Sequence, residues 1–293
     1  MSYLQIASWN IEHLSGASRE NKKQTAYALA EHIEMAGVDI IALQEIYVTH
    51  EDQGERRNGD LDRVAELLEE HLGDPWEYRI FPNRVAGDTT QLCCLMWNTK
   101  RVQKTEEMRI DVSHGDGSYT LWDRAPHAVK FTMLMDIWHK RDGEWVKEPE
   151  KKSIVIVPLH MKSNWGGTTV NKRKRCKEAE ALCERLAAVR EMDESVILIG
   201  DTNCLNADEP AIGTFIDHGL RDLNNNDAAT YWSREYGESP FDRAFVADNR
   251  QEFKYTRQYV LRSSDLTMHD RLLSDHYMIK ICVKTYVDDA DPR

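Results

Sequence analysis

Long hydrophobic runs are absent from this 293-residue sequence. The longest apolar runs, such as 153–158 and 195–199, have the length of a β-strand, whereas a membrane-spanning helix needs roughly 20 residues. The first residues show no basic segment followed by a small-residue cleavage site, so we expect no secretory signal. Apolar residues make up 41% and charged residues 30%, which is typical of a soluble globular protein.

Paired cysteines are also absent. The six cysteines include no CxxC pair and show no regular spacing. Cys93 and Cys94 are adjacent in an apolar run, Cys282 lies in another, and Cys176 and Cys183 lie on a predicted helix. This pattern favours buried free thiols over disulfides or a zinc site. We therefore expect a cytoplasmic protein.

Positive charge is in deficit, with 38 Lys and Arg against 50 Asp and Glu and a net charge of −12. This balance argues against tight, extended, metal-free binding of DNA, because phosphates need local positive charge. The charge is unevenly distributed, however. Residues 160–190 carry eight Lys or Arg against three Glu, while residues 45–74 are strongly acidic. A nucleic-acid partner is therefore still compatible with the sequence, and several carboxylates can face a bound cation instead.

Internal repeats, low-complexity tracts and Pro- or Ser-rich linkers are absent, so we predict one domain over residues 1–286 and a frayed acidic tail over 287–293. Apolar patterning predicts strands at 4–9, 39–43, 77–81, 92–97, 108–112, 128–138, 153–159, 196–199, 244–246, 255–260 and 277–284. Helices are predicted at 20–36, from a cap at Asp60 to Leu72, and at 170–192. Asp142-Gly143 predicts a hairpin turn. This order indicates stacked sheets covered by helices.

Polar residues lie directly before or after the predicted buried strands. They are Asn10, Glu45, His160, Asp201, Asn203, Asp242, Asp275 and His276. In α/β proteins, strand ends gather at one edge of a sheet, where residues distant in sequence can meet. Carboxylate and carboxamide oxygens suit Mg²⁺ or Mn²⁺, and two histidines suit proton transfer and oxyanion stabilisation.

Most of these positions, taken singly, have a simpler interpretation. An Asn after a strand is usually a turn residue, a lone His160 is more often a hydrogen-bonded core histidine, and Asp242-Arg243 resembles a surface ion pair. The segment 200–203 is more informative, because Asp201 and Asn203 share a face after a Gly turn. The adjacent Asp and His at 275–276 also need partners in their apolar context.

Seven short segments occur in the order of the motif set of the endonuclease/exonuclease/phosphatase superfamily. They are Ser8-Trp9-Asn10, Leu43-Gln44-Glu45, Arg124-Ala125-Pro126, Leu159-His160-Met161-Lys162-Ser163, Gly200-Asp201-Thr202-Asn203, Phe241-Asp242-Arg243 and Ser274-Asp275-His276. The chain resembles the deoxyribonuclease-like, metal-dependent phosphodiesterases of this superfamily over nearly its whole length. The resemblance implies a four-layer α/β/β/α sandwich of two mixed β-sheets flanked by helices, with the site at one edge of the paired sheets.

The resemblance also implies a divalent-metal site. Asn10 and Glu45 resemble the metal-binding pair, with Glu45 as the principal ligand, and Asp275 lies where a second metal ligand is expected. The implied ion is Mg²⁺ or Mn²⁺, which would bind a non-bridging oxygen and the departing oxygen of a phosphodiester.

Five further residues match the catalytic positions, namely His160, Asp201, Asn203, Asp242 and His276. His160 resembles the histidine that donates to the scissile phosphate, and Asp201 and Asn203 resemble the pair that positions water and phosphoryl oxygens. Our hypothesis is that His276, oriented by Asp242, is the general base. Asp201 is the rival base, in which case both histidines hold the phosphate.

Substrate contacts are expected from Arg124, Lys162 and Asn164. One position departs from the family pattern, because Gln91 aligns where a glutamate normally orients the first histidine. A neutral Gln that held the His160 ring would stabilise an imidazolium less, so we expect His160 to act mainly as a neutral donor.

The segment after His160 allows two interpretations. Lys172, Arg173, Lys174 and Arg175 are either the solvated start of a helix or a grip on substrate phosphates at a helix N-terminus. Trp165, beside two glycines, either stacks on a base or ring or covers an edge of the core.

The resemblance predicts the reaction better than the substrate. We favour a nuclease acting on DNA rather than RNA, because the Arg-Ala-Pro segment resembles deoxyribonuclease relatives and residues 160–190 are basic. The alternatives are a phospholipid or sphingomyelin phosphodiesterase, with 131–145 as its candidate apolar hairpin, and an inositol or nucleotide phosphatase. A catalytically silent binding module would be expected to lack a metal ligand or a histidine, whereas all matched polar positions are intact here.

Overall fold

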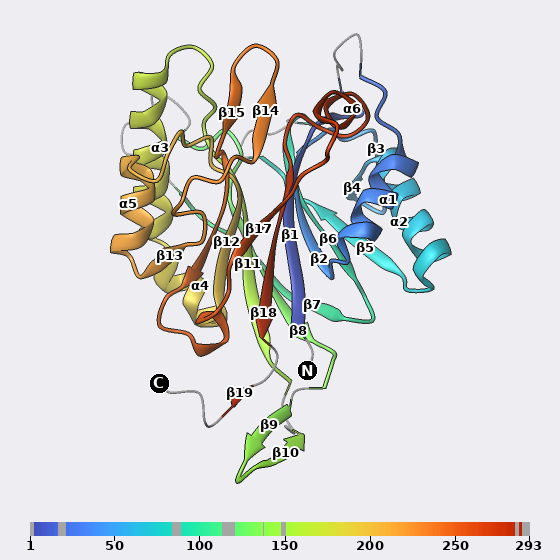
Figure 1. Cartoon of the computed structure of the whole chain (residues 1–293), viewed down its shortest axis with the longest axis vertical. Coiled ribbons are helices and arrows are strands. Elements are labelled where there is room, and N and C mark those ends of the chain that lie inside the picture. The colour runs from blue at the N-terminus through green and yellow to red at the C-terminus, as the bar shows by residue number, and fades with distance from the viewer. Residues whose placement is uncertain are drawn as a thin grey trace.

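Two six-stranded β-sheets face each other, and helices cover the outer face of each (Figure 1). The computed structural model describes residues 3–16, 22–83, 89–112, 121–136, 138–147, 151–284 and 287–288. Each sheet is mixed, because it contains one parallel strand pair among antiparallel ones. The predicted four-layer α/β/β/α sandwich of two mixed sheets is therefore confirmed.

The first sheet has the strand order β17-β18-β1-β2-β6-β5. In chain order its strands are β1 (Tyr3–Leu14), β2 (Ile40–Ile46), β5 (Trp76–Ile80), β6 (Leu92–Asn98), β17 (Gln258–Leu261) and β18 (Met278–Lys284). The helices α1 (Ala26–Ala36) and α2 (Gly59–Leu72) share a buried apolar cluster with its outer face.

The second sheet has the order β13-β16-β12-β11-β8-β7. Its strands are β7 (Val102–Arg109), β8 (His127–Met133), β11 (Ser153–His160), β12 (Val196–Asp201), β13 (Leu220–Asp222) and β16 (Asp242–Ala247). The helices α3 (Thr168–Cys183), α4 (Leu186–Met192) and α5 (Pro210–Asp217) pack on its outer face.

Smaller elements lie at the two ends of the sandwich. The short hairpins are β3–β4 (His50–Asp52, Glu55–Arg57), β9–β10 (Trp138–Arg141, Glu144–Lys147) and β14–β15 (Tyr231–Ser233, Gly237–Ser239). The remaining elements are η1 (Gln251–Phe253), α6 (Leu266–Leu272) and β19 (Val287–Asp288). The predicted turn at Asp142-Gly143 joins β9 to β10.

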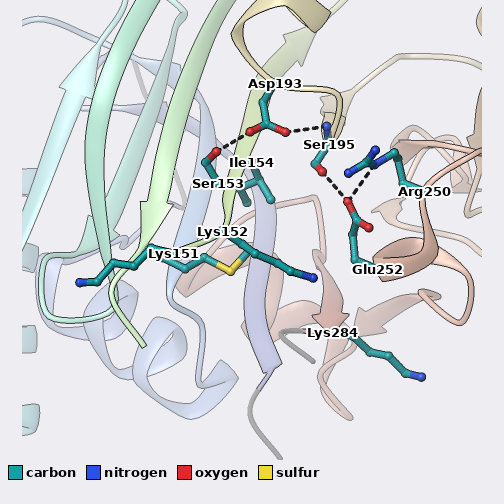
Figure 2. A pocket seen from close by; sticks show the side chains of 10 residues that line it. Lys151, Lys152, Ser153, Ile154, Asp193, Ser195, Arg250, Glu252 and Lys284 are labelled. Carbon is teal, nitrogen blue, oxygen red and sulfur yellow. Dashed lines mark hydrogen bonds and ion pairs between the residues drawn. The ribbon is translucent and has the colours of Figure 1, made fainter. Parts of the chain in front are cut away.

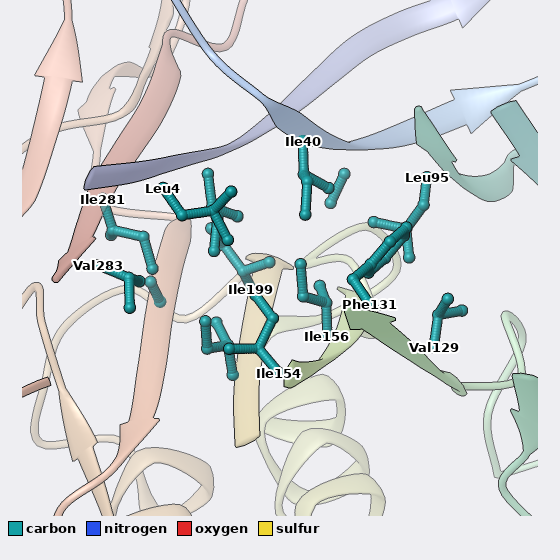
Figure 3. Close-up of a cluster of buried hydrophobic side chains, with 14 of the residues drawn as sticks. Leu4, Ile40, Leu95, Val129, Phe131, Ile154, Ile156, Ile199, Ile281 and Val283 are labelled. Carbon is teal, nitrogen blue, oxygen red and sulfur yellow. The ribbon is translucent and has the colours of Figure 1, made fainter. Parts of the chain in front are cut away.

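Side-chain alternation gives each sheet two buried faces. Leu4 of β1 points into the space between the sheets, where it joins Ile154 and Ile199 of the second sheet (Figure 3). Ala7 and Trp9 of the same strand point the other way, into the cluster beneath α1. Strands buried on both faces explain the continuous apolar runs of the sequence, and each fully buried Ile stabilises the fold by roughly 1.5–3 kcal/mol.

Two predicted helix starts are wrong. α1 begins at Ala26 with Thr25 as its cap, residues 22–25 are not helical, and 17–21 lie outside the described residues. α2 is capped by Asn58, whose side-chain oxygen accepts the Leu61 N–H at 3.0 Å, rather than by Asp60. Asp60 lies in the first turn and accepts the hydroxyl of Ser15 instead. Asn and Asp are both strong cap residues, so the sequence alone does not separate them.

The helix predicted at 170–192 is two helices. α3 ends at Cys183 and α4 begins at Leu186, yet Leu182, Leu186 and Val189 all belong to one apolar cluster. The apolar spacing therefore continues across the break and conceals it. Arg185, between the helices, donates to the backbone carbonyl of Asp111.

Other boundaries also differ from the predictions. The strand predicted at 108–112 is β7, which ends at Arg109, and the strand predicted at 128–138 ends at Met133. Val287 and Asp288 form β19, which pairs with β9, so this part of the predicted tail is not frayed, while 289–293 lie outside the described residues. The six cysteines are free thiols, but Cys176 and Cys282 are half-buried rather than buried as predicted. Among the described residues, no helix is long and apolar enough to cross a membrane.

Candidate active site

Strand register brings three predicted polar residues together at one end of the second sheet. β11 and β12 are parallel, with His160 opposite Asp201 at their last positions. β12 and β16 are antiparallel, with Asp201 opposite Asp242. These three side chains are neighbours because the apolar parts of the strands fix the register.

The Asp201 carboxylate lies at the centre of a larger cluster. Its Oδ2 accepts a hydrogen bond from Asn10 Nδ2 at 3.1 Å and lies 3.7 Å from His160 Nε2 and 3.9 Å from His276 Nε2. Its Oδ1 accepts the backbone N–H of Asn203 at 2.8 Å. Side chains from β1, β11 and the segment before β18 therefore converge on one carboxylate.

His276 is held through both its ring and its backbone. Its Nδ1 hydrogen donates to Asp242 Oδ2 at 2.8 Å, which leaves Nε2 facing the central carboxylate. Its backbone carbonyl accepts from Trp9 Nε1 at 3.1 Å and lies 3.0 Å from His269 Nε2. Its backbone N–H donates to Ser274 Oγ at 3.0 Å. These buried contacts fix the orientation of the imidazole.

Glu45 lies beside Asn10 at the end of β2. Its Oε1 accepts from Asn10 Nδ2 at 3.2 Å and lies 3.8 Å from His160 Nε2. Its Oε2 accepts the backbone N–H of His13 at 3.2 Å and lies 3.3 Å from the His13 Nδ1. The Asn10 amide therefore bridges Glu45 and the central carboxylate, while its oxygen accepts the backbone N–H of Glu12.

The cluster opens into a cavity of about 940 Å³. Predicted site residues that line it are Glu45, Arg124, His160, Lys162, Asn164, Asp201, Asn203 and His276. Asn10 and Asp242 lie behind this surface and are 2% and 0% exposed. The two buried residues therefore orient groups that reach the cavity.

Four lining residues other than glycine have a left-handed backbone conformation. The φ angles are 56° at His13, 65° at Glu45, 52° at Gln91 and 54° at Asn203. Such residues are uncommon away from Gly and cluster at functional sites. The backbone is thus bent where side chains must turn toward the cavity.

Burial and neighbouring charges shift the proton affinities of the central groups. Burial raises the pKa of Asp201 to about 7. Burial lowers the pKa of His160 well below its usual value, and the Arg124 guanidinium lowers it further. Burial also acts to lower the pKa of His276, but Asp242 and Asp201 outweigh it and raise that pKa well above 6.5. His160 is therefore a neutral ring beside the paired His276 and Asp201.

The donor set fits a hard divalent cation. Among the described residues, no Lys or Arg lies within ion-pair distance of Glu45 or Asp201. A buried carboxylate without a counterion is unfavourable, and carboxylate oxygens are the ligands that Mg²⁺ and Mn²⁺ prefer. Glu45, oriented by Asn10, is placed to hold such an ion.

A second acidic grouping overlaps the cluster. Ligand atoms of Asp201, Asp242 and His276 lie within 4.8 Å of one another. The shortest contact among them is the 2.8 Å hydrogen bond between His276 Nδ1 and Asp242, which occupies that ring nitrogen. This trio is therefore better suited to moving a proton than to holding a metal ion.

No protein-family model and no curated protein matches the chain. Solved structures do. An endonuclease/exonuclease/phosphatase family protein from Bacteroides thetaiotaomicron matches with a TM-score of 0.63 at 18% identity, over 96% of this chain and 97% of that one. A mannosyl-6-phosphatase from the same organism gives 0.62 at 16% identity, over 96% and 99%. D. rerio TDP2, complexed with a single-strand DNA product, gives 0.58 at 15% identity, over 97% and 100%.

The chain has the endonuclease/exonuclease/phosphatase fold. The resemblance based on seven short motifs is thus confirmed at the level of the fold. Asp275 is placed differently from the other predicted site residues. It donates its backbone N–H to Glu12, its carbonyl accepts from Trp232, and it is not among the described residues that line the cavity. A metal-ligand role for Asp275 stays a prediction.

Gln91, which aligns where a glutamate normally orients the first histidine, accepts a hydrogen bond from Arg124 Nη2. In the part of the chain that the structure describes, His160 Nδ1 has no hydrogen-bond partner. Gln91 therefore orients the predicted phosphate-contacting arginine.

The loop after His160 is anchored, and one cation of the following helix is structural. Asn164 Nδ2 donates to the carbonyl of Asn203 at 2.9 Å. Lys162 Nζ lies 3.4 Å from Asp123. Arg175 is fully buried and binds Glu209 with contacts of 2.9–3.1 Å, so it is not part of a phosphate grip.

Several residues that line the cavity were not predicted from the sequence, and His13 and Asp123 are among them. His13 contacts Glu45, and Asp123 lies 3.4 Å from Lys162 Nζ. The spacing Asn-x-x-His after a buried strand is a signal that points to His13. Asp123 precedes Arg124 directly but looks like any surface acid.

A smaller pocket of about 240 Å³ lies at the opposite end of β11, beside Ser153 (Figure 2). Lys151, Lys152 and Lys284 border it, but their ammonium groups extend in different directions. Its Glu252 accepts from Ser195 and lies 3.2 Å from Arg250. The pocket therefore presents no converging set of ligand groups.

Proposed function

We propose that the protein hydrolyses phosphodiester bonds with the help of a divalent metal ion and that its substrate is DNA. One observation carries the proposal: the Asp201 carboxylate lies within 3.1–3.9 Å of Asn10, His160 and His276 at the wall of a single cavity. A carboxylate set that fits a hard cation, beside two histidines, is what metal-assisted hydrolysis of an anionic ester needs.

Each group of the cluster has a distinct chemical task. A divalent ion held by Glu45, whose carboxylate Asn10 orients, would withdraw electrons from a phosphoryl oxygen and the leaving oxygen. Neutral His160 donates a hydrogen bond from Nε2 to a non-bridging oxygen, and Arg124 at the cavity wall adds positive charge to it. Preorganised donors of this kind stabilise the charge that develops in the transition state.

Proton transfer belongs to the His276–Asp201 pair. The two groups face each other at 3.9 Å, and Asp242 fixes the tautomer that presents His276 Nε2 to the cavity. A water placed between them and the phosphorus gives its proton to the Asp201 carboxylate as it attacks, because the raised pKa of His276 leaves that ring protonated. Asn203, whose backbone binds Asp201, keeps the carboxylate in position.

The choice of DNA is supported by the basic start of α3 and by a structural neighbour described in complex with a single-strand DNA product. A lipid substrate is less well supported. Trp145 and Val146 of the β9–β10 hairpin are 40% and 42% exposed, but the hairpin lies at the opposite end of the molecule from β14–β15, which borders the cavity (Figure 1).

The test is incubation with plasmid DNA, a single-stranded oligodeoxynucleotide, RNA and sphingomyelin vesicles, each with Mg²⁺, Mn²⁺ or EDTA. We expect metal-dependent cleavage of DNA. His276→Ala and Asp201→Asn should each lower kcat by roughly 10²–10⁴-fold, which is the usual contribution of acid–base catalysis. His50→Ala, at an exposed position outside the cavity, is the control.

Three results would contradict the proposal. They are cleavage that persists in EDTA, near-normal turnover of both cluster variants, and hydrolysis of RNA or lipid with no action on DNA. Binding of DNA without cleavage under every metal condition would identify a catalytically silent module instead.

A further inference from the structure

An exposed tryptophan stands at the mouth of the cavity. The Trp165 side chain is 87% exposed, although burial of such a ring normally stabilises a fold. It lines the same cavity as His160, Asn203 and His276. A large ring kept in solvent beside polar site residues indicates a ligand that covers it.

The backbone that carries Trp165 is fixed from both sides. The Trp165 carbonyl accepts from the Asn171 side chain of α3 at 2.7 Å, and the preceding Asn164 is bound to Asn203 at 2.9 Å. Asn171 is 3% exposed, so this support is built into the fold. The ring is therefore presented by an anchored loop.

Further aromatic rings extend from the reacting groups to the rim. Tyr231 and Phe241 pack beside His276, with ring centroids at 5.0 and 6.2 Å, and 5.0 Å from each other. Tyr236, in the turn of the β14–β15 hairpin, is 74% exposed and lines the same cavity. The hairpin and α3 rise at the same end of the molecule (Figure 1). The cavity thus offers ring faces beside the phosphate position.

Positive charge is scarce along this lining. Arg124 and Lys162 are its Lys and Arg residues among those described, against Glu45, Asp123 and Asp201. Arg124 already binds Gln91, and Lys162 lies 3.4 Å from Asp123. A duplex that lies across a site is held mainly through rows of contacts to successive phosphates. This cavity is instead suited to binding one phosphate group, with aromatic rings beside it.

We propose that the enzyme acts on unpaired nucleotides, and that Trp165 and Tyr236 stack on bases next to the scissile phosphate. This inference rests on the proposed function and names its substrate class. Base faces are covered by their neighbours within a duplex, so stacking on a protein ring requires a single strand, a frayed end or an extruded base. The two exposed rings then select flexible DNA.

The experiment compares three substrates of one length. These are a short single-stranded oligodeoxynucleotide, the same strand in a blunt duplex, and a strand of abasic residues. We expect a higher kcat/KM for the single strand than for the duplex. Trp165→Ala should raise KM for the strand with bases by about 5- to 150-fold, the range for loss of one stacked base, and leave the abasic strand unaffected.

Matched variants separate stacking from general damage. Trp165→Phe keeps a ring and should recover most of the affinity, while Tyr236→Ala should act in the same direction as Trp165→Ala. Trp145→Ala, 40% exposed on the remote β9–β10 hairpin, should change nothing. Equal losses on strands with and without bases, or a duplex cleaved as well as the single strand, would overturn the inference.

A binding measurement distinguishes failure of the stacking inference from failure of the proposed function. Fluorescence anisotropy of a labelled strand on His276→Ala, with and without Trp165→Ala, reports stacking without turnover. If no phosphodiester is cleaved but binding still depends on Trp165 and on the bases, the catalytic proposal fails and the stacking site stands. If cleavage occurs and binding is indifferent to Trp165, the catalytic proposal stands and the stacking site fails.

Discussion

Gly200 lies where β12 passes closest to β11, one residue before the central carboxylate. Its φ is +155°, and a Cβ placed there would lie 2.0 Å from the backbone carbonyl oxygen of Leu159. No side chain can be accommodated at that distance unless the strands separate. The glycine therefore permits the close pairing that sets His160 beside Asp201.

We expect Gly200→Ala to destabilise the protein by about 1–3 kcal/mol or more, because the backbone itself must move. A shift of this kind displaces Asp201, so turnover should fall by about 100-fold even where the protein folds. Urea unfolding and kcat at saturating substrate measure the two effects. Gly213→Ala in α5 is the control, because an added Cβ there would have no neighbour within 4 Å, and the change should stabilise by up to about 1 kcal/mol. Equal stability of the two variants would contradict the steric argument.

At the scale of elements, α3 is held to α5 by a buried ion pair. Arg175 and Glu209 are 0% and 2% exposed, and the guanidinium binds both carboxylate oxygens. Arg175 Nη1 also donates to the carbonyl of Lys162 at 2.9 Å. The pair therefore joins the helix layer to the loop that follows His160.

Arg175→Met should lower the free energy of unfolding by about 3–5 kcal/mol, because it leaves the buried Glu209 with only the Lys172 ammonium, 3.7 Å away. The double variant Arg175→Met/Glu209→Met removes both charges and should recover most of that loss. Urea unfolding of the wild type, both single variants and the double variant completes the cycle. Additive losses in the double variant would show that the ion pair is not the source of the effect.

Long elements were predictable from the sequence, whereas short ones were not. Buried strands such as β1 and β12 are marked by apolar runs, and their polar ends located Asn10, Asp201 and the other residues of the cluster. α5 and α6 have eight and seven residues, too few for a periodic pattern to stand out. The β14–β15 hairpin has strands of three residues each and was missed for the same reason.

Contacts in the site between residues far apart in the sequence could be predicted only where the ordered family motifs implied them. The pairing of His276 with Asp242 was expected, and the structure places their atoms 2.8 Å apart. Whether Gln91 forms a hydrogen bond with His160 or with Arg124 depends on side-chain packing, which no local sequence pattern encodes. His13 was missed because it lies in β1 beyond the predicted strand end at Trp9, where a single histidine has many ordinary roles.

At the scale of the whole molecule, folding depends on a histidine held between the two sheets. His127 of β8 is 3% exposed and stacks on Phe81, which belongs to the apolar cluster between the two sheets. The ring centroids are 4.9 Å apart and the ring planes lie at 19°. Its Nδ1 hydrogen donates to the carbonyl of Ala125 at 3.0 Å. Burial lowers the pKa of His127 to about 4, against the weaker raising effects of the hydrogen bond to Ala125 and of Glu107.

This lowered pKa gives the stability of the fold a definite pH dependence. Unfolded chains bind a proton at this histidine below about pH 6.5, whereas the folded protein does not until about pH 4. The contribution is therefore complete above pH 6.5 and is lost as the pH falls through that window, by roughly 3 kcal/mol in all. The nearby cations Arg109 and Arg79 lower the same pKa further.

His127→Asn removes the titrating group and keeps a donor for the Ala125 carbonyl. The variant should be less stable than the wild type at pH 8, because it loses the stacked ring. Its free energy of unfolding should then fall less steeply as the pH is lowered from 6.5 to 5, because unfolding no longer takes up a proton at this site. Urea unfolding at closely spaced pH values measures both the offset and the slope. Parallel profiles for the two proteins would mean that the charge of His127 does not govern acid unfolding, and that other groups buried between the sheets and helices do.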